Sequence, residues 1–309
     1  MRPRTILLGC IALVAALAPL YLHGYALYLA TEVALYAIAA AALDLLVGYA
    51  GLVSLGQAAY FGIGAYAAAI VAAHFGADLW LTLAAGFVCA AIFAAVTAPL
   101  TLRSHGIFFL MVTLAFSQLA YATADKWHSL TGGSDGLVVP KLAISDPAFY
   151  LVALGILAAV MLALGLLVRS PFGRVLAATR QNETRVRALG LSAFWYKYWA
   201  IVLVGGITGL AGVLHAHHRA FVSLADLHWT NSVTLLVMVL LGGRQTLWGG
   251  VVGAAVFTLL EAWISSKTDQ WEMFVIGAVL IAIVLFTPRG LTSLFASFRT
   301  MVGGGGEHA

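Results

Sequence analysis

The chain has 309 residues, of which 62% are hydrophobic and only 9% charged, and its formal net charge is +4. Soluble domains are roughly half apolar and about one-quarter charged, so a water-exposed fold could not bury this excess of apolar side chains. The basic residues stand at the ends of apolar runs rather than on one face, which excludes a nucleic-acid-binding domain. The composition predicts a membrane protein whose apolar side chains face lipid.

Ten apolar runs are candidates for membrane-crossing helices. A crossing needs about 20 apolar residues, and the runs lack the alternating pattern of a barrel strand. In lipid, backbone groups must therefore be paired within each helix. In chain order the runs cover 5–22, 26–47, 55–73, 79–102, 106–124, 148–168, 198–215, 230–243, 247–265 and 271–287. We predict an all-α polytopic membrane protein, one transmembrane domain over 1–309 with its core at 26–291.

The number and orientation of the crossings depend on two further observations. The run at 230–243 is short, and with 247–265 it could form a re-entrant hairpin, which would leave eight crossings. With a cytoplasmic N-terminus, twelve Lys and Arg residues lie inside and four outside, which agrees with the positive-inside rule. The sequence therefore predicts that both termini are cytoplasmic.

Two hydrophilic segments separate the apolar runs. The segment at 125–147 is predicted to be outside and has the Gly, Ser, Asp and Pro content of an ordered loop. The segment at 169–197 is predicted to be cytoplasmic and holds six of the sixteen basic residues. Ser170 and Pro171 predict a helix start and Gly190 a helix end, so this segment should contain one or two short helices off the bilayer. The tail at 300–309 is predicted to be flexible.

Glycine concentrates in two groups that interrupt the spans. Such interruptions in two halves of a chain are typical of a transport pathway, but small residues also permit close helix packing, and the spacing favours neither interpretation. The two groups are Gly48, Gly51, Gly56, Gly62 and Gly64, and Gly242, Gly243, Gly249, Gly250 and Gly253.

Three carboxylic acids lie within apolar runs. Glu32, Asp44 and Glu261 would be costly in lipid, so each is either functional, as in a proton relay, or paired with a neighbouring helix. Asp44 draws the most interest because it precedes Gly48. The three histidines at 215, 217 and 218 have no carboxylate or thiol cluster beside them, so packing is favoured over a metal site and no metal is predicted.

Enzyme motifs are weak or missing. Gly132–Gly136 matches G-x-S-x-G, but that hydrolase motif requires a strand before it and a helix after it, so a turn is the favoured interpretation. The phosphate-binding pattern G-x-x-x-x-G-K-[ST] does not occur in the sequence. The chain is predicted not to be an enzyme and to need no cofactor, and any ATP that drives it would be bound by another subunit.

The stretch from Asp44 to Tyr66, DLLVGYAGLVSLGQAAYFGIGAY, resembles the signature of LivM-type permeases of branched-chain amino acid ABC importers. Similarity extends from about residue 30 to Leu291. Further matching blocks follow in the same order, namely Thr131–Gly136, Ser170–Arg174 through Arg187–Gly190, His217 with Phe221–Ser223, and Leu241–Gly243 with Gly249.

This resemblance implies a permease subunit of a bacterial inner-membrane importer for branched-chain or related amino acids. Its implied partners are a second, LivH-like permease, two cytoplasmic LivG-like and LivF-like ATPase subunits, a periplasmic or surface-anchored solute-binding protein, and membrane lipid. The segment at 169–197 would then be the coupling loop that docks on an ATPase subunit. Its predicted residues are Ser170, Pro171, Gly173, Arg174, Arg180, Glu183, Arg187 and Gly190, and the predicted substrate-pathway residues are Asp44, Gly48, Tyr49, Ser54, Gln57, Gly62 and Gly243.

Two alternatives stay open at this point. One is a urea or short-amide permease of the same superfamily, and the other is a proton-coupled secondary transporter that uses Asp44 and Glu261. The chain departs from the family where Asn is usual, at Asp44, and where His is frequent, at Gln57. Both positions belong to the predicted pathway, so they bear directly on the choice of solute.

Overall fold

The computed structural model describes residues 19, 21, 23–267 and 277. Within these residues, seven helices are long and apolar enough to cross a membrane, and the all-α prediction is confirmed. They are α2 (Tyr25–Asp44) with the π-helical η1 (Leu45–Ala50), α3 (Gln57–Phe75), α4 (Leu79–Thr101), α5 (Ile107–Lys126), α7 (Asp146–Arg169), α10 (Ala193–Arg219) and α12 (Trp248–Ser265). The predicted runs at 5–22 and 271–287 and the predicted tail at 300–309 lie outside the described residues.

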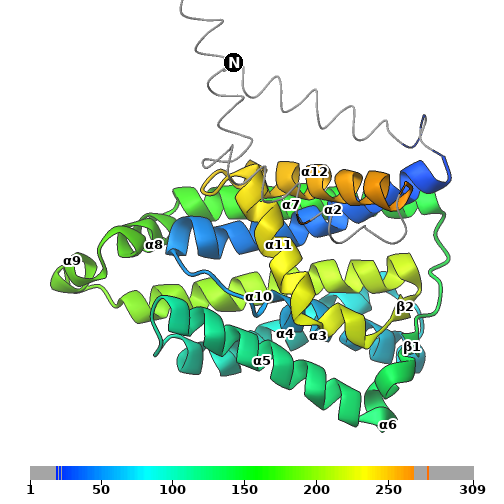
Figure 1. Ribbon diagram of the computed structural model, residues 1–309, viewed down its shortest axis with the longest axis horizontal. Helices are drawn as coiled ribbons and strands as arrows, with labels where there is room; N and C mark the ends of the chain where they lie inside the picture. The colour runs from blue at the N-terminus through cyan, green and yellow to red at the C-terminus, as the bar shows by residue number, and fades with distance from the viewer. Residues whose placement is uncertain (1–18, 20, 22, 268–276, 278–309) are drawn as a thin grey trace, which may run out of the picture.

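Shorter elements lie at the two ends of this helical bundle and across it (Figure 1). They are α6 (His128–Thr131), the 3-10 turn η2 (Gly133–Asp135), β1 (Leu137–Val138), α8 (Pro171–Gln181), α9 (Glu183–Ala188), β2 (Phe221–Val222), the 3-10 turn η3 (Leu224–Leu227) and α11 (Trp229–Gly242). We call the end with α8 and α9 the α8 end, and the end with β1, β2 and α6 the β1 end.

Two predictions about these shorter elements can be compared with the structure directly. The G-x-S-x-G match forms the turn η2 followed by β1, which pairs antiparallel with β2, so the turn interpretation is confirmed. The run at 230–243 forms α11, a helix of 14 residues that crosses the bundle obliquely, and it is shorter than the seven long helices (Figure 1).

The core is built around α10 and α2. Helix α10 packs on α3, α4 and α2, and α2 also packs on α12 and α7. The end of α2 is completely buried from Ala37 to Asp44, whereas α4, α5 and α7 turn large apolar side chains outward, among them Val96, Met111 and Leu162. Apolar side chains on the outer surface of long helices are what a lipid solvent favours.

Close approach of α3 and α10 depends on glycine. A Cβ atom on Gly64 would overlap the backbone of Gly209, and one on Gly212 would overlap the Phe61 carbonyl group. Without side chains at these positions the two backbones come into direct contact, as is common between helices in membranes. The glycines of α11 and α12 do the same, since a Cβ on Gly253 would overlap the Met238 carbonyl group. At these positions the packing interpretation of the glycine groups is confirmed.

We predict that Gly64→Ala lowers the thermal unfolding temperature of the detergent-solubilised protein. The added methyl group must push α3 away from α10, and overpacking of this kind costs about 1–3 kcal/mol. Gly155→Ala is the matched control, because a Cβ on Gly155 of α7 meets nothing within 4 Å. Equal unfolding temperatures for the two variants would contradict the close packing of α3 and α10.

Candidate functional site

The chain breaks its helical path after η1. Gly51 ends η1 with φ of 71°, a left-handed conformation that favours glycine. The N–H groups of Gly51 and Leu52 still bond back to the Leu46 carbonyl oxygen, and residues 51–56 reach the start of α3 outside any helix. Side chains from other helices pair the backbone here. Leu55 N donates to Thr113 Oγ1 at 3.1 Å, and Ala58 N donates to Ser232 Oγ at 2.7 Å. We call residues 51–56 the first break.

A second break, residues 243–247, joins α11 to α12. Its backbone is held by Asp44, whose Oδ1 accepts a hydrogen bond from Gln245 N at 3.0 Å and whose Oδ2 accepts one from Leu247 N at 2.9 Å. Gln245 and Leu247 both have positive φ, which costs free energy in residues other than glycine. The buried Asp44 carboxylate therefore stabilises a strained turn at the start of α12.

Tyr49 and Gly48 bring η1 against the same turn. The Tyr49 hydroxyl donates to the Gln245 carbonyl oxygen at 2.8 Å. A Cβ on Gly48 would lie 2.8 Å from Gln245 N and even closer to the Asp44 carboxylate, so only glycine fits between them. Asp44, Gly48, Tyr49 and the second break thus form one cluster, which we call the Asp44 cluster.

Arg180 of α8 reaches the Asp44 cluster from the α8 end. Its Nη1 donates to the Gly48 carbonyl oxygen, and its side-chain carbons pass over Gly51. The guanidinium also faces the Gln245 amide, whose oxygen, when turned toward it, accepts a hydrogen bond from Nη2 at 3.0 Å. Arg180 therefore contacts the end of η1 and the second break together.

Helices α8 and α9 begin and end at the predicted residues. Ser170 Oγ accepts a hydrogen bond from Gly173 N at 3.4 Å at the start of α8, with Pro171 in its first turn. Gly190, with φ of 80°, follows the end of α9. A Cβ on Gly173 would lie 2.5 Å from the Leu167 carbonyl oxygen, so this glycine allows α8 to fold back against the end of α7.

Glu183 fastens α9 to α10. Its Oε2 accepts a hydrogen bond from Lys197 Nζ and its Oε1 one from Arg187 Nη2, both at 2.6 Å. Partial burial raises the pKa of Glu183, but the hydrogen bonds from Lys197 and Arg187 outweigh that effect, and the net pKa is lowered. The carboxylate is therefore charged at neutral pH, and its two pairs hold α9 in place.

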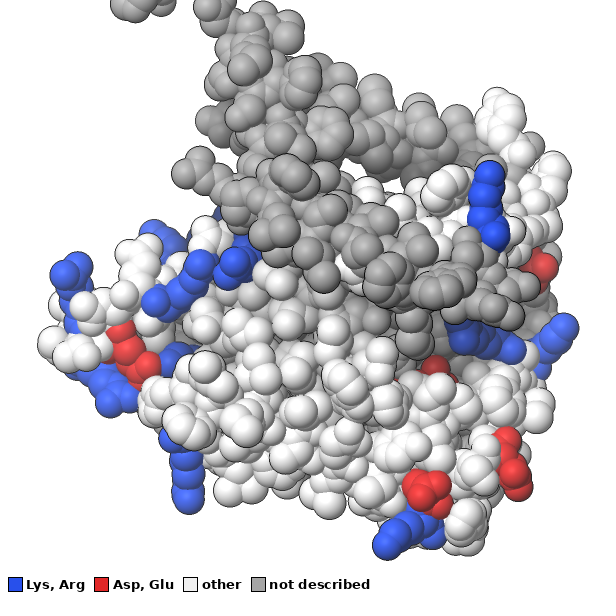
Figure 2. All heavy atoms as spheres, in the orientation of Figure 1, with Lys and Arg blue, Asp and Glu red and all other residues white. Residues whose placement is uncertain are grey.

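The predicted coupling-loop residues fall into two sets. Ser170, Gly173, Arg180 and Glu183 bond to or pack against other elements, although Arg180 is partly exposed. Pro171 and Arg174 are exposed, and so is Arg187, which pairs with Glu183 within α9. Beyond α9 the chain exposes an apolar residue, Leu189, at 75% of its surface. Figure 2 shows basic side chains gathered at this end of the molecule. We call residues 185–191 the α9 tip.

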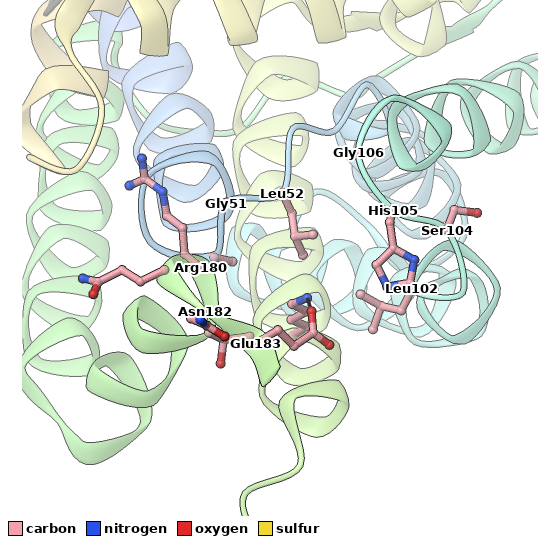
Figure 3. Close-up of a pocket in the computed structure, with 13 residues that line it drawn as sticks. Gly51, Leu52, Leu102, Ser104, His105, Gly106, Arg180, Asn182 and Glu183 are labelled. Atoms are coloured by element: carbon pink, nitrogen blue, oxygen red, sulfur yellow. Dashed lines mark hydrogen bonds and ion pairs between the residues drawn. The ribbon is translucent and has the colours of Figure 1, made fainter. Parts of the chain in front are cut away.

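A cavity of about 430 Å³ opens between the first break, the α4–α5 connection and the α8–α9 junction (Figure 3). Its lining is mostly polar and includes residues that sequence reasoning did not identify, among them Ser104 and His105. Figure 3 shows Gly51 and Leu52 between Arg180 on one side and His105 on the other. Water can therefore approach the first break from the α8 end.

The predicted pathway residues also separate into groups. Asp44, Gly48, Tyr49 and Gly243 belong to the Asp44 cluster or its turn, whereas Ser54 and Gln57 lie at the start of α3. Gly62 packs against Leu227 of η3 and belongs to neither group.

The start of α3 has polar partners that sequence reasoning missed. Gln57 Oε1 accepts a hydrogen bond from Thr208 Oγ1 of α10 at 2.9 Å, and its buried Nε2 has no protein partner. Together with Thr113 and Ser232 these groups make a polar region among apolar helices. Isolated hydroxyl residues within apolar runs were the available signal, because such residues often bond across helices.

His215, His217 and Glu32, near the β1 end, have polar partners within the protein. His217 Nε2 lies 2.9 Å from Thr82 Oγ1, His215 Nε2 lies 3.5 Å from Asp226 Oδ1, and Glu32 pairs with Arg219 at 2.9 Å. Among residues 23–267, no group of three or more His, Cys, Asp or Glu side chains is placed to hold a metal ion. The pairing interpretation of Glu32 is confirmed.

Comparisons with known proteins agree with this architecture. A family model described as the permease component of branched-chain amino acid transport systems matches residues 25–284. The high-affinity branched-chain amino acid transport system permease proteins LivM of Salmonella typhimurium and Escherichia coli are each 28% identical over 294 residues, 85% of this chain and 69% of theirs. The autoinducer 2 import system permease protein LsrC of Salmonella paratyphi B is 28% identical over 186 residues, 57% of this chain and 52% of LsrC.

One solved structure is also similar, PsaBC from Streptococcus pneumoniae in complex with Fab. Its TM-score is 0.48 and its sequence identity 16%, over 87% of this chain and 92% of that chain. At this level the likeness carries no argument.

We predict that Asp44→Ala destabilises the protein more than Asp78→Ala. The first change leaves the N–H groups of Gln245 and Leu247 without an acceptor, and the loss at the buried Leu247 N–H alone costs about 1–3 kcal/mol. Asp78 is the matched control because it caps α4 through a single exposed hydrogen bond to Trp80 N, which contributes about 1 kcal/mol. Thermal unfolding in detergent measures both, and equal losses would contradict the role of Asp44.

We predict that the stability difference between the wild-type protein and Glu183→Gln depends on acid pH. Because the pKa of Glu183 is lowered in the folded protein, its pairs contribute fully above the ordinary value of 4.5. That contribution is lost as the pH falls through the folded-state pKa. Unfolding temperatures measured from neutral pH down to about pH 3 should therefore converge at the acid end. A difference that stays constant over this range would contradict the pairing.

Proposed function

Because the chain belongs to the family of permease components of branched-chain amino acid transport systems, we propose that it is one membrane subunit of an ATP-driven importer for branched-chain or similar amino acids. The sequence lacks a phosphate-binding loop of the Walker type, so the proposal places ATP hydrolysis on separate ATPase subunits. A second permease and a solute-binding protein complete the proposed assembly.

The distribution of charge supports a cytoplasmic location for the α8 end. Among the described residues, eight Lys and Arg residues lie at the α8 end and four at the β1 end. Those at the α8 end are Arg103, Arg169, Arg174, Arg180, Arg185, Arg187, Lys197 and Arg244, and those at the β1 end are Lys126, Lys141, Arg219 and Lys267. An excess of basic residues marks the cytoplasmic side.

The α9 tip is the observation that carries the proposal. It combines exposed arginines with Leu189, which is 75% exposed, at the α8 end of the molecule. Arginine is enriched at protein interfaces, and a partner docked on the tip would remove the Leu189 side chain from water. The contacts of Ser170, Gly173 and Glu183 hold the tip rigidly, so it can transmit force from an ATPase subunit.

The start of α3 is the proposed solute contact. Helix starts that lie within a membrane protein carry unpaired or side-chain-paired N–H groups, which suit the carboxylate of an amino acid. Gln57 Nε2, which has no protein partner, adds a donor there. In the proposed cycle the two breaks act as hinges, and the site opens alternately to each side.

A proton-coupled mechanism has less support. The Asp44 carboxylate accepts two backbone hydrogen bonds in a strained turn, an arrangement that accounts for its burial without proton transfer. Glu32, a second acid within a membrane-crossing helix, is paired with Arg219.

We predict that Arg185→Glu combined with Leu189→Glu releases the ATPase subunits. Reversing a charge and placing a carboxylate in the interface should lower co-purification of the ATPase subunits and ATP-dependent uptake of labelled leucine by about tenfold or more, since removal of an interface anchor costs about 2 kcal/mol. Excess isoleucine or valine should compete with leucine in the wild-type complex, and urea should not.

Lys141→Glu is the control, because it makes the same charge reversal as Arg185→Glu on an exposed residue at the β1 end. Normal co-purification and uptake in the double variant would refute the docking assignment. Competition by urea alone would refute the proposed solute class.

A further inference from the structure

Arg180 makes contacts that differ from those of the α9 tip. It is the tenth residue of α8, but its guanidinium bonds the Gly48 carbonyl oxygen in η1, 132 positions earlier in the chain. Arg180 is partly exposed and lines the cavity beside the first break, whereas Arg187 at the tip pairs with Glu183 within α9. Its contact with η1, rather than burial, distinguishes Arg180 from the tip.

The Gly48 carbonyl oxygen, which Arg180 binds, is a group that η1 itself cannot pair. The last carbonyl groups of a helix have no partner within it, and Gly48 lies two residues before the end of η1. A cation at a helix C-terminus is also favoured by the helix dipole. Arg180 thus supplies a charge-assisted hydrogen bond where η1 ends, a kind of bond that is stronger than one between neutral groups.

The shape of the first break fits this side chain closely. A Cβ on Gly51 would lie 2.8 Å from Arg180 Cγ, so the aliphatic part of Arg180 passes directly over the glycine. Any shift of α8 along this direction therefore presses on the residue where the path of α2 turns.

The same guanidinium is joined to the second break. It faces the Gln245 amide, and Gln245 is held in turn by Asp44 through its N–H and by Tyr49 through its carbonyl oxygen. The two breaks consequently meet around one side chain. The planar fork of arginine can bond two groups at once, which the single ammonium of lysine does less well.

The ion pairs of Glu183 also hold the α8–α9 segment, but they do not involve the helix breaks. Glu183 pairs with Arg187 on α9 and with Lys197 at the start of α10. These pairs position the tip against α10 and reach neither break.

We propose that Arg180 is the positioning residue that transmits movement of α8 and α9 to both helix breaks, so that ATPase closure at the tip reorients α2 and α12 together. This inference rests on the proposed function, in that it takes an ATPase subunit to dock at the α9 tip. Arg180 acts through Gly48, Gly51 and Gln245 and is not itself a docking or solute-binding residue.

The test is the ratio of leucine taken up to ATP hydrolysed, measured with the complete importer in liposomes. We expect Arg180→Ala to keep its ATPase subunits and its ATP hydrolysis but to lower uptake per ATP by about tenfold, the factor that loss of one charge-assisted hydrogen bond supplies. Arg180→Lys should recover part of the ratio, because it keeps the charge without the fork. Gln181→Ala, the exposed neighbour in sequence, is the matched control and should leave the ratio unchanged.

A normal ratio in Arg180→Ala would overturn the inference. Loss of the ATPase subunits from Arg180→Ala would also overturn it, because Arg180 would then be part of the docking surface. If Arg180→Ala does not assemble, the ratio in Arg180→Lys decides in the same way. The docking assignment fails separately, through normal uptake in the Arg185→Glu and Leu189→Glu double variant, and the proposed function fails if the wild-type importer takes up no leucine with ATP, so the failures are distinguishable.

Discussion

Backbone groups inside a bilayer must be paired by the protein, and this requirement shapes the region between α2 and α3 and between α11 and α12. At both breaks the helical hydrogen bonds stop, and side chains replace them. Thr113 and Ser232 serve the first break, and Asp44 serves the second. The polar residues within these apolar runs are therefore explained first by the backbone they pair, and any role in transport builds on that.

Since the pairing groups come from distant parts of the chain, the breaks are joined to one another. Asp44 links the end of α2 to the start of α12, and Arg180 links both to the segment that lies off the bundle. The α8–α9 segment, held by Glu183 at one end and by the Gly173 corner at the other, is connected in this way to two points where the helices are interrupted. Such an arrangement is suited to carrying a movement from outside the membrane to its interior.

Much of the fold followed from one-dimensional patterns, because apolar run length determines which segments can cross lipid and capping residues determine where helices begin and end. The long helices, the start of α8 at Ser170 and the stop at Gly190 are of this kind. The site was harder to predict. Sequence spacing does not show which side chains of α8 reach other helices, so Arg180 could not be distinguished from Arg174. The partners of Asp44 lie about 200 positions away. Glycine groups were ambiguous for the same reason, since packing and hinge positions look alike until their neighbours are known.

Hydrogen exchange of the backbone amides at 44–56 and 243–249 tests the link between the breaks most directly. It would be measured on the complete importer, with and without a non-hydrolysable ATP analogue. The account predicts that nucleotide changes the protection of both segments together, and that Arg180→Ala removes this change while the α9 tip stays protected by the ATPase subunit. Protection that changes in only one segment, or that changes equally in Arg180→Ala, would contradict it.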